Sequence, residues 1–258
     1  MVNFIAIIPA RYASTRFPAK PLAMLEGKTV IQRVYQQISR FVDKAVVATD
    51  HQLIFEEVKR FGGEVVMTST THKSGTDRCN EALSKINGHF DVVINVQGDE
   101  PFIQQSQIEA LKQCFNDTEV DIATLVKPFE NRDGFQAVAN PNSPKVVLGN
   151  NNQALYFSRS VIPYVRGVEM GDEWLQKQTF YKHIGIYAYR VNVLKEITKL
   201  PQSSLEIAES LEQLRWLQNG YKIKVGITNV ETVGIDTPQD LIKAEQFLQS
   251  HPEFNTLQ

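Results

Sequence analysis

The first half of the chain alternates short apolar runs with segments of helical periodicity, and no other feature constrains the fold as strongly. The apolar runs have the length and composition of buried strands, at residues 3–8, 45–48, 65–67 and 92–96. Each run precedes a segment with an apolar face at helical spacing, at residues 30–41, 51–61, 76–87 and 105–115. Strands that are apolar on both faces and alternate with helices are typical of a parallel sheet covered by helices. The sequence therefore predicts an α/β fold with a mostly parallel central sheet.

The second half is less regular and predicts a mixed, β-rich insertion packed on the main sheet. Its β-like runs are separated by turns rich in Asn, Pro and Gly, and they lie at residues 122–126, 146–148, 155–157 and 184–189. An amphipathic helix is expected from about 205 to 218. Its apolar positions fall in register at Leu205, Ala208, Leu211, Leu214 and Leu217. A strand at 222–227 and a helix at 238–249 complete the pattern.

Composition argues against two broad classes of protein. The 258 residues carry a net charge of −2 and a pI of about 6.2, whereas nucleic-acid binders that work by bulk charge are usually strongly basic. No apolar stretch approaches the length that spans a bilayer, and the first residues resemble a strand more than a signal peptide. Cys79 and Cys114 form neither a CxxC pair nor a zinc spacing, so they are expected to be reduced thiols. We therefore expect a cytoplasmic protein that binds neither nucleic acid nor membrane.

The loop after the first apolar run holds three cations and no acidic residue. Arg11, Arg16 and Lys20 are spaced Arg-x4-Arg-x3-Lys. Arginine can grip phosphate oxygens in pairs, and lysine acts as a compact point charge. Small neighbouring residues would let backbone N–H groups approach a phosphate, at Ala10, Ala13 and Ser14. We interpret the loop as a site for a polyanion, most simply a nucleoside triphosphate; the alternative is a solvated basic loop.

Two aspartates are candidate ligands for magnesium. Asp99 follows the fourth apolar run in the segment VQGDEPF, and a carboxylate at a strand end can hold Mg²⁺ against phosphate oxygens. In the segment GIDTPQD, a short strand is expected to end at Asp236 and a helix to begin at Thr237 or Pro238. The alternatives are a turn-forming residue at Asp99 and a simple helix cap at Asp236 or Thr237.

Ligands of parallel sheets bind beyond the carboxyl ends of the strands. The loops expected to gather at that edge lie at residues 9–20, 50–51, 68–75 and 97–103. The third of them ends in the segment THKSGTDR, where Ser74, Gly75 and Thr76 present backbone N–H and C=O groups that suit a nucleobase. A helix cap followed by a turn is the alternative for that segment.

Two segments of the second half hold further polar candidates. YKHIGIYAYR alternates like a strand, which places His183 and Tyr187 on one face, although such a histidine is more often structural. ESLEQLR places Glu209, Glu212 and Gln213 on one face of the expected helix, although most such faces are simply solvated.

Taken together, eight segments of the chain closely resemble 3-deoxy-manno-octulosonate cytidylyltransferases, the CMP-Kdo synthetase family. They run in family order as IIPARYASTRFPAKPL, VATDH, HKSGTDR, NVQGDEPFI, ALYFSRSVIP, KHIGIYAYR, LEQLRWLQNGYKI and GIDTPQDL. The opening loop alone occurs in broader sugar nucleotidyltransferase families, whereas the combination is highly specific. The resemblance implies a nucleotide-diphospho-sugar transferase-like, Rossmann-like fold and a homodimer.

The resemblance also implies a reaction and its cofactor. CTP and 3-deoxy-D-manno-octulosonate (Kdo) would give CMP-Kdo and pyrophosphate for bacterial lipopolysaccharide synthesis. The anomeric hydroxyl would attack the α-phosphate in line, assisted by Mg²⁺. One nucleotidyltransferase domain is expected across residues 1–258. Its parts are a nucleotide-binding part at about 1–118, a sugar-binding and dimerisation part at about 119–228, and a return to the main sheet at about 229–258.

By position, the resemblance implies a role for each candidate residue. The catalytic residues would be Arg11, Arg16, Lys20 and Asp99. The nucleotide would contact Ala10, Arg11, Lys20, Ser74, Gly75, Thr76, Arg78 and Gln97. The sugar would contact Gln97, Arg159, His183, Tyr187, Glu209 and Gln213. Mg²⁺ would bind Asp99 and Asp236.

Other functions are consistent with parts of this pattern. A glycosyltransferase of similar topology typically holds its metal with an Asp-x-Asp motif, whereas Asp99 is followed by Glu100 and Pro101. A binding or regulatory protein that has lost chemistry would have no need for all three cations and both carboxylates. The sugar itself is a further alternative, because a related keto-acid sugar such as sialic acid would need only a changed pocket.

Overall fold

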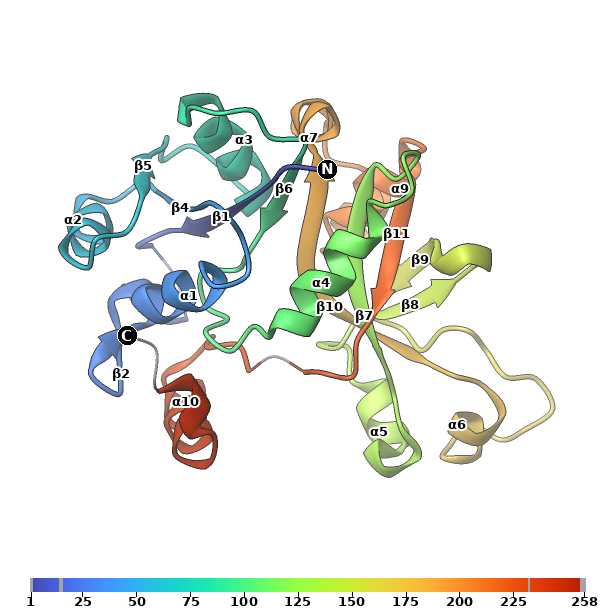
Figure 1. The fold of residues 1–258 in the computed structure, drawn as a ribbon. Helices are drawn as coiled ribbons and strands as arrows, with labels where there is room; N and C mark the ends of the chain where they lie inside the picture. The colour runs from blue at the N-terminus through green and yellow to red at the C-terminus, as the bar shows by residue number, and fades with distance from the viewer. Residues whose placement is uncertain (1, 14–15, 232, 256–258) are drawn as a thin grey trace. The chain divides into compact units, whose positions relative to one another are not determined.

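The structure is a computed structural model that describes residues 2–13, 16–231 and 233–255 (Figure 1). The chain divides into two compact units. The first comprises Met1–Gln105, Arg190–Thr198 and Thr232–Gln258, and the second comprises Ser106–Tyr189 and Lys199–Glu231. Ser14, one of the small loop residues expected to admit a phosphate, lies outside the described residues.

In the described part of the first unit, four parallel strands lie in the order β6-β1-β4-β5. These strands are β1 (Phe4–Ala10), β4 (Ala45–Thr49), β5 (Val65–Met67) and β6 (Val92–Asn95). In the register, Ile7 of β1 pairs with Val46 of β4 and with Asn95 of β6. A separate short hairpin joins β2 (Met24–Leu25) to β3 (Lys28–Thr29). The predicted apolar runs therefore form neighbouring parallel strands, which confirms the α/β fold.

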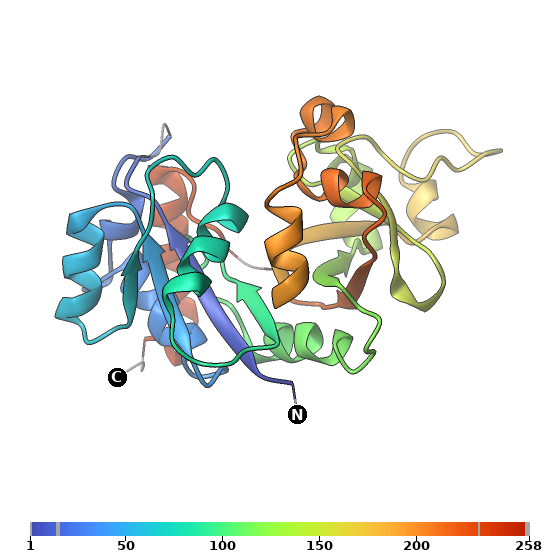
Figure 2. The same ribbon diagram turned by 90° about the horizontal axis from the view of Figure 1, so that it is seen from above.

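Helices cover both faces of the first unit's strands. They are α1 (Val30–Ile38), α2 (Gln52–Arg60), α3 (Gly75–Lys85), α7 (Val191–Ile197) and α10 (Pro238–Ser250). Helices α1 and α3 lie on opposite faces, as right-handed crossovers require when the strand order reverses between β5 and β6 (Figures 1 and 2). Side-chain oxygens cap the first turns of α1, α3 and α10, at Thr29, Ser74 and Thr237.

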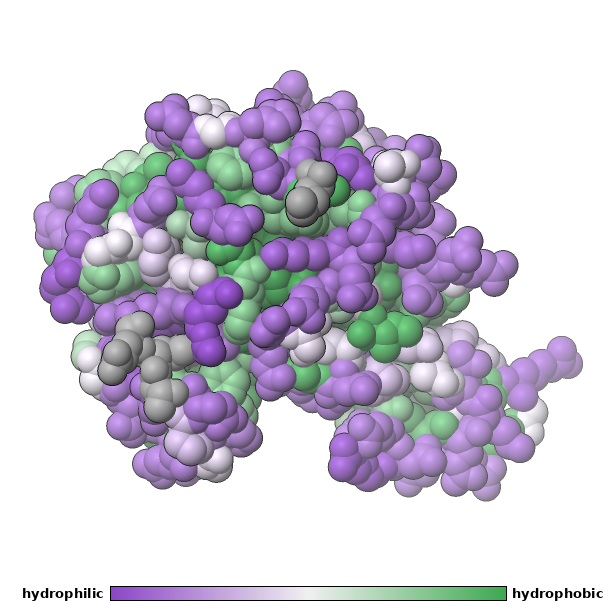
Figure 3. Space-filling view, viewed as in Figure 1, coloured by the Kyte–Doolittle hydropathy of each residue, from purple (hydrophilic) through white to green (hydrophobic). Residues whose placement is uncertain are grey.

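The central strand of the first unit is buried on both faces. Ile5, Ile7 and Ile8 of β1 and Val47 of β4 are fully buried. Each such aliphatic side chain contributes about 1.5–3 kcal/mol through removal from water. The surface seen in Figure 3 is mainly hydrophilic, so the apolar runs are turned inward. This burial fixes where the strands end and therefore where the polar loops begin.

The second unit contains a mixed group of strands. In it, β11 (Ile223–Ile227) runs parallel to β7 (Ile122–Pro128), and β10 (Tyr181–Arg190) runs antiparallel to β7. The strands β8 (Lys145–Leu148) and β9 (Ala154–Ser158) form an antiparallel pair, and β8 also pairs with the start of β10. This arrangement confirms the mixed, β-rich part that the sequence predicts.

Short helices complete the second unit. They are α4 (Gln105–Cys114), α5 (Gly134–Ala139), α6 (Glu173–Lys177), α8 (Ser204–Glu209) and α9 (Gln213–Gln218). An aromatic cluster surrounds Trp174, which is fully buried and contacts the rings of Phe135 and Phe180. Among the described residues of either unit, no helix combines the length and the apolar character needed to cross a membrane.

The predicted single helix at 205–218 is wrong, because the chain breaks between α8 and α9. Ser210 adopts a left-handed conformation with φ of +50°. The guanidinium of Arg159 donates hydrogen bonds to the carbonyls of Glu209 and Ser210, two acceptors that a continuous helix would use internally. Of the five predicted apolar positions, Leu211 and Leu214 are buried. A contact from Arg159, which follows β9 and is distant in sequence, therefore accompanies the end of the first helix.

The predicted short strand before Asp236 is also wrong, since the described residues there form no strand. Instead, the backbone N–H of Ile235 donates to the carbonyl of Asp99 at 2.9 Å. This single backbone contact places the two candidate metal ligands beside each other.

Candidate active site

The loops that follow β1, β4, β5 and β6 leave the same edge of the first unit, because these strands are parallel. Two glycines allow close approach at this edge. A Cβ at Gly98 would lie 2.8 Å from the carbonyl oxygen of Pro9, and one at Gly75 would lie 3.2 Å from the Pro9 ring. The predicted gathering of these loops is confirmed.

Four charged side chains meet at this edge, and we call Arg16, Lys20, Asp99 and Asp236 the charge cluster. The Nζ of Lys20 contacts Oδ2 of Asp99 and lies 3.1 Å from Oδ1 of Asp236. An Arg16 guanidinium nitrogen lies 3.2 Å from Oδ2 of Asp236. Lys20 begins a short 3-10 helix (η1, Lys20–Leu22) after Ala19, whose φ is +56°. The structure thus brings together two predicted phosphate-binding cations and both predicted metal ligands.

The donor set of the charge cluster fits Mg²⁺. Mg²⁺ usually binds proteins through one or two carboxylates and completes its shell with water and substrate phosphates. Asp99 and Asp236 supply two carboxylates that converge on one point, now filled by the Lys20 ammonium. Among residues 2–13, 16–231 and 233–255, no group of three or more His, Cys, Asp and Glu side chains is suited to hold a metal. A metal here would therefore need ligands from outside the protein.

The other predicted residues of the opening loop differ in their exposure and contacts. Arg11 is exposed, and it makes no ion pair with another described residue. Ala10 ends β1 and is buried. Tyr12 stacks on His51, with ring centroids 3.9 Å apart and planes 14° apart. This stack ties the loop to the start of α2, a contact that the sequence analysis missed.

The predicted nucleobase segment forms the start of α3. Ser74 caps the helix, accepting a hydrogen bond from the Asp77 N–H at 3.1 Å, so the helix-cap alternative holds for its side chain. Gly75 and Thr76 follow in the first turn, and Thr76 is buried. Gln97 follows β6 and is half-buried.

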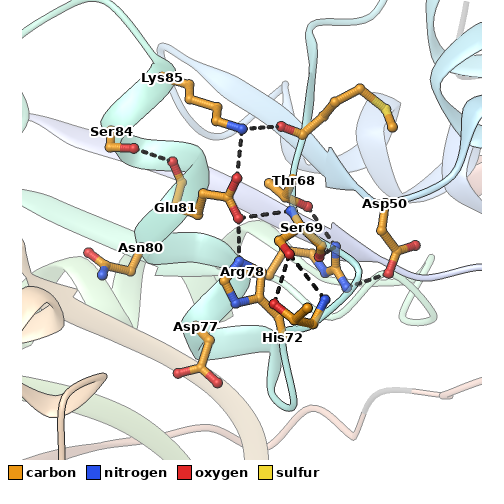
Figure 4. A network of polar contacts seen from close by, with 12 residues as sticks. Asp50, Thr68, Ser69, His72, Asp77, Arg78, Asn80, Glu81, Ser84 and Lys85 are labelled. Carbon is orange, nitrogen blue, oxygen red and sulfur yellow. Dashed lines mark hydrogen bonds and ion pairs between the residues drawn. The ribbon is translucent and has the colours of Figure 1, made fainter.

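Arg78, which is predicted to contact the nucleotide, is buried and donates hydrogen bonds within the protein. Its guanidinium donates to Asp50 at 2.6 Å, to the Thr68 hydroxyl at 2.6 Å and to the Ser69 carbonyl at 3.3 Å, and its side chain is 5% exposed (Figure 4). These acceptors lie at the ends of β4 and β5. Arg78 therefore fastens two ligand-edge loops to α3, and its contact with the nucleotide stays a prediction.

A second network on α3 was missed by the sequence analysis. Glu81 accepts from the His72 ring, from Lys85 and from the Ser69 N–H (Figure 4). Burial raises the pKa of Glu81, but the hydrogen bonds from Lys85, Ser69 and His72 outweigh it and lower that pKa to about 2. The i, i+4 spacing of Glu81 and Lys85 was the one signal that could have revealed this network.

In the second unit, two predicted sugar-binding residues meet. The carboxylate of Glu209 accepts from the Ser158 hydroxyl at 2.6 Å and from the Arg159 backbone N–H at 2.9 Å. The Arg159 guanidinium donates to the carbonyls of Glu209, Pro141 and Ser210. We call Ser158, Arg159, Glu209 and Ser210 the arginine frame. Because the helix breaks at Ser210, the prediction that Glu209 shares a helical face with Glu212 and Gln213 is wrong.

His183 and Tyr187 lie together on β10, with ring centroids 5.3 Å apart. The Thr124 hydroxyl donates to the Ile186 carbonyl at 2.8 Å, so it accepts at 2.9 Å from Nε2–H of His183. Burial lowers the pKa of His183 to about 3, and burial also raises the pKa of Tyr187. Both rings are therefore neutral near pH 7. The side chain of the buried Gln213 has an Nε2 group with no hydrogen-bond acceptor among the described residues.

Comparison with known proteins defines the class first. The family model described as Cytidylyltransferase matches residues 5–223. The fold and the charge cluster agree with that class, since cytidylyl transfer requires a grip on a triphosphate.

Individual relatives narrow the class. The chain is 68% identical over 248 residues to 3-deoxy-manno-octulosonate cytidylyltransferase of Phocaeicola vulgatus, covering 96% of this chain and 98% of the relative. It is 68% identical over 249 residues to the enzyme of the same name from Bacteroides thetaiotaomicron, covering 96% and 99%. A solved structure of CMP:2-keto-3-deoxy-manno-octonic acid synthetase complexed with CTP is similar, with a TM-score of 0.87, 40% identity, and coverage of 96% and 99%. The chain belongs to the 3-deoxy-manno-octulosonate cytidylyltransferase family.

Proposed function

We propose that this chain transfers a cytidylyl group from CTP to Kdo, giving CMP-Kdo and pyrophosphate for bacterial lipopolysaccharide synthesis. The observation that supports this most directly is the charge cluster. It lies at the ligand edge of a chain that is 68% identical, over nearly its whole length, to enzymes named for that reaction.

The first unit supplies the grip on CTP in this proposal. Arg11, Arg16 and Lys20 bind the phosphates, and a triphosphate offers Arg16 and Lys20 new acceptors in place of the aspartates. Ala10, Ser74, Gly75 and Thr76 border the nucleoside through backbone groups, and Gln97 lies on the loop that carries Asp99. Arg78 holds the neighbouring loops in place.

The transfer step needs little covalent chemistry from the protein. The anomeric hydroxyl of the sugar attacks the α-phosphorus in line, a P–O bond forms, and the bond to pyrophosphate breaks. Lys20 and an arginine stabilise the negative charge that develops on the phosphates. Asp99 and Asp236 would hold Mg²⁺, whose charge would neutralise phosphate oxygens and favour departure of pyrophosphate.

The second unit binds the sugar acid. Arg159 and Glu209 form a rigid frame, His183 and Tyr187 supply neutral polar groups, and the Nε2 group of Gln213 is available to a sugar hydroxyl. We also propose that the chain acts in the cytoplasm as a homodimer. Its two cysteines, Cys79 and Cys114, are buried. Light scattering coupled to size-exclusion chromatography tests the dimer, for which a single peak of twice the chain mass is expected.

The decisive experiment measures pyrophosphate release with a substrate panel of CTP or UTP combined with Kdo or N-acetylneuraminate. Release is expected with CTP and Kdo at a rate far above the other three pairs. Release of CMP or UDP from a nucleotide sugar, without pyrophosphate release from CTP, would instead establish a glycosyltransferase. Binding of CTP without turnover of either sugar would indicate a regulatory protein.

A further inference from the structure

Lys145, on β8, is a fully buried lysine that no part of the proposed mechanism uses. Its ammonium donates to the backbone carbonyl of Asn140 at 3.0 Å and to that of Arg159 at 2.6 Å. None of the ion pairs among the described residues involves Lys145. A buried cation is costly unless it is well compensated, so its position calls for a physical reason.

The two carbonyls that Lys145 holds belong to the surroundings of the arginine frame. The Arg159 residue that accepts from Lys145 through its carbonyl also donates to Glu209 through its backbone N–H. Its guanidinium reaches the carbonyl of Pro141, the neighbour of Asn140. Lys145 therefore fixes both the backbone of Arg159 and the turn against which the guanidinium rests.

The ammonium of Lys145 is held by neutral acceptors. Burial lowers the pKa of Lys145, while the Glu209 carboxylate raises that pKa and the Arg159 guanidinium lowers it. Its two hydrogen bonds go to backbone carbonyls and leave one ammonium N–H without an acceptor among the described residues. A positive charge in a region of low dielectric attracts a neighbouring anion.

We propose that Lys145 is a positioning residue that gives the arginine frame its preference for a sugar with a free carboxylate. This inference rests on the proposed function and names the feature of the substrate that the frame selects. Lys145 itself is too buried to touch a ligand. It acts by holding Arg159 in place and by adding a fixed positive charge behind it.

The test compares kcat/KM for Kdo with kcat/KM for its uncharged methyl ester, at saturating CTP. In the wild type we expect a strong preference for the acid. Lys145→Met should reduce that preference by about tenfold, while the KM for CTP changes by less than about twofold. A merely structural lysine would lower both rates together and leave the preference unchanged. Lys145→Arg, which keeps the charge, should retain the preference within about threefold.

Lys182 provides the matched control. It pairs with Lys145 in the register of β10 and β8, but its ammonium is ion-paired with Glu231. Lys182→Met should keep the wild-type preference. If Lys145→Met does not fold, Lys145→Gln replaces it. If neither folds, a folded Lys145→Arg variant decides: retained preference supports the inference, and lost preference overturns it.

Different outcomes would overturn the proposed function and the role of Lys145. A wild-type protein that releases no pyrophosphate from CTP with Kdo, and binds no Kdo by calorimetry, overturns the proposed function together with this inference. An active wild type whose Lys145→Met variant keeps the full preference for the acid overturns the role of Lys145 alone.

Discussion

The charge cluster of the first unit and the arginine frame of the second use charge in opposite ways. In the charge cluster two cations meet two carboxylates directly; the side chains of Arg16 and Asp236 are 66% and 49% exposed, and those of Lys20 and Asp99 are 13% and 26% exposed. In the arginine frame the one cation, Arg159, donates to backbone carbonyls, and the buried Lys145 donates to the carbonyl of Arg159. Exposed pairs contribute about 0–1 kcal/mol each and are easily exchanged. Buried charged groups are costly to disturb.

The two regions are therefore expected to serve different purposes. The cations and carboxylates of the charge cluster pair with one another, and in the proposed function a triphosphate and Mg²⁺ would separate them. The contacts of the arginine frame form without a ligand, so we expect them to change little when a sugar binds. Side chains of the first region should therefore matter more for turnover than for folding, and those of the second for both.

The largest effect is expected from Asp99→Ala in the charge cluster. Turnover should fall by at least about 10²-fold, because a carboxylate that organises charge around the phosphates is lost. The free energy of unfolding should change by less than about 1 kcal/mol, since the ion pair is partly exposed. Pyrophosphate release and urea unfolding measure the two quantities. Asp43→Ala, at an exposed position of the same unit, is the control and should change neither turnover nor stability. Near-normal turnover of Asp99→Ala would refute the role of Asp99 at the phosphates.

The next effect concerns stability in the arginine frame. Glu209→Ala removes the acceptor of the Ser158 hydroxyl and of the Arg159 N–H, so the free energy of unfolding should drop by about 2 kcal/mol. Sugar turnover should fall as well. Urea unfolding followed by circular dichroism gives the stability, and the exposed Glu169→Ala should stay within about 0.5 kcal/mol of wild type. Unchanged stability of Glu209→Ala would show that the contacts of the arginine frame, like those of the charge cluster, can be lost at little cost in folding free energy.

A smaller effect tests whether the charge cluster balances itself. Lys20 fills the space between Asp99 and Asp236, so Mg²⁺ should bind weakly without nucleotide. Lys20→Met should strengthen nucleotide-free Mg²⁺ binding about tenfold, because two facing carboxylates then lack a counter-ion. Isothermal titration calorimetry with Mg²⁺ alone measures this directly. Arg16→Met leaves the contact between Lys20 and the two aspartates in place, so it should change the affinity for Mg²⁺ less. Equal affinities for wild type and both variants would show that Lys20 does not compete with Mg²⁺.

The sequence predicts the first unit better than the second, and the reason is physical. The strands β1, β4, β5 and β6 are apolar on both faces, so local pattern alone locates them to within about two residues. Parallel topology explains why Lys20 and Asp99 lie together at one edge. Asp236 joins them through the backbone hydrogen bond between Ile235 and Asp99.

Long-range contacts explain what the sequence could not predict. Apolar spacing favours a continuous helix over 205–218, but the carbonyls of Glu209 and Ser210 accept hydrogen bonds from Arg159 instead. The local sequence contains no sign of this long-range contact. Lys145 is similar, because a lysine in a short apolar run is expected at the surface. Arg78 was found through the family segment, yet its buried contact with Asp50 depends on strand ends that are far apart in sequence.

The smallest predicted effect concerns His183, a buried ring on β10 in the second unit. Its folded-state pKa is about 3, well below the ordinary value of about 6.5, because burial disfavours the charged ring. The unfolded chain therefore takes up a proton as the pH falls through about 6.5, while the folded chain does not. Stability is fully present above that pH and is lost below it, by about 1 kcal/mol between pH 7 and pH 5.5.

Substituting this histidine separates it from the carboxylates that titrate in the same range. His183→Gln should lose less stability than wild type between pH 7 and pH 5.5, by the same amount of about 1 kcal/mol. His89, whose side chain is 89% exposed, is the matched control, and His89→Gln should follow the wild-type pH profile. Urea unfolding at both pH values measures the difference. If wild type and His183→Gln lost the same free energy of unfolding between the two pH values, the ring of His183 would accept a proton in the folded protein. The second unit would then accommodate a change of charge as easily as the charge cluster does.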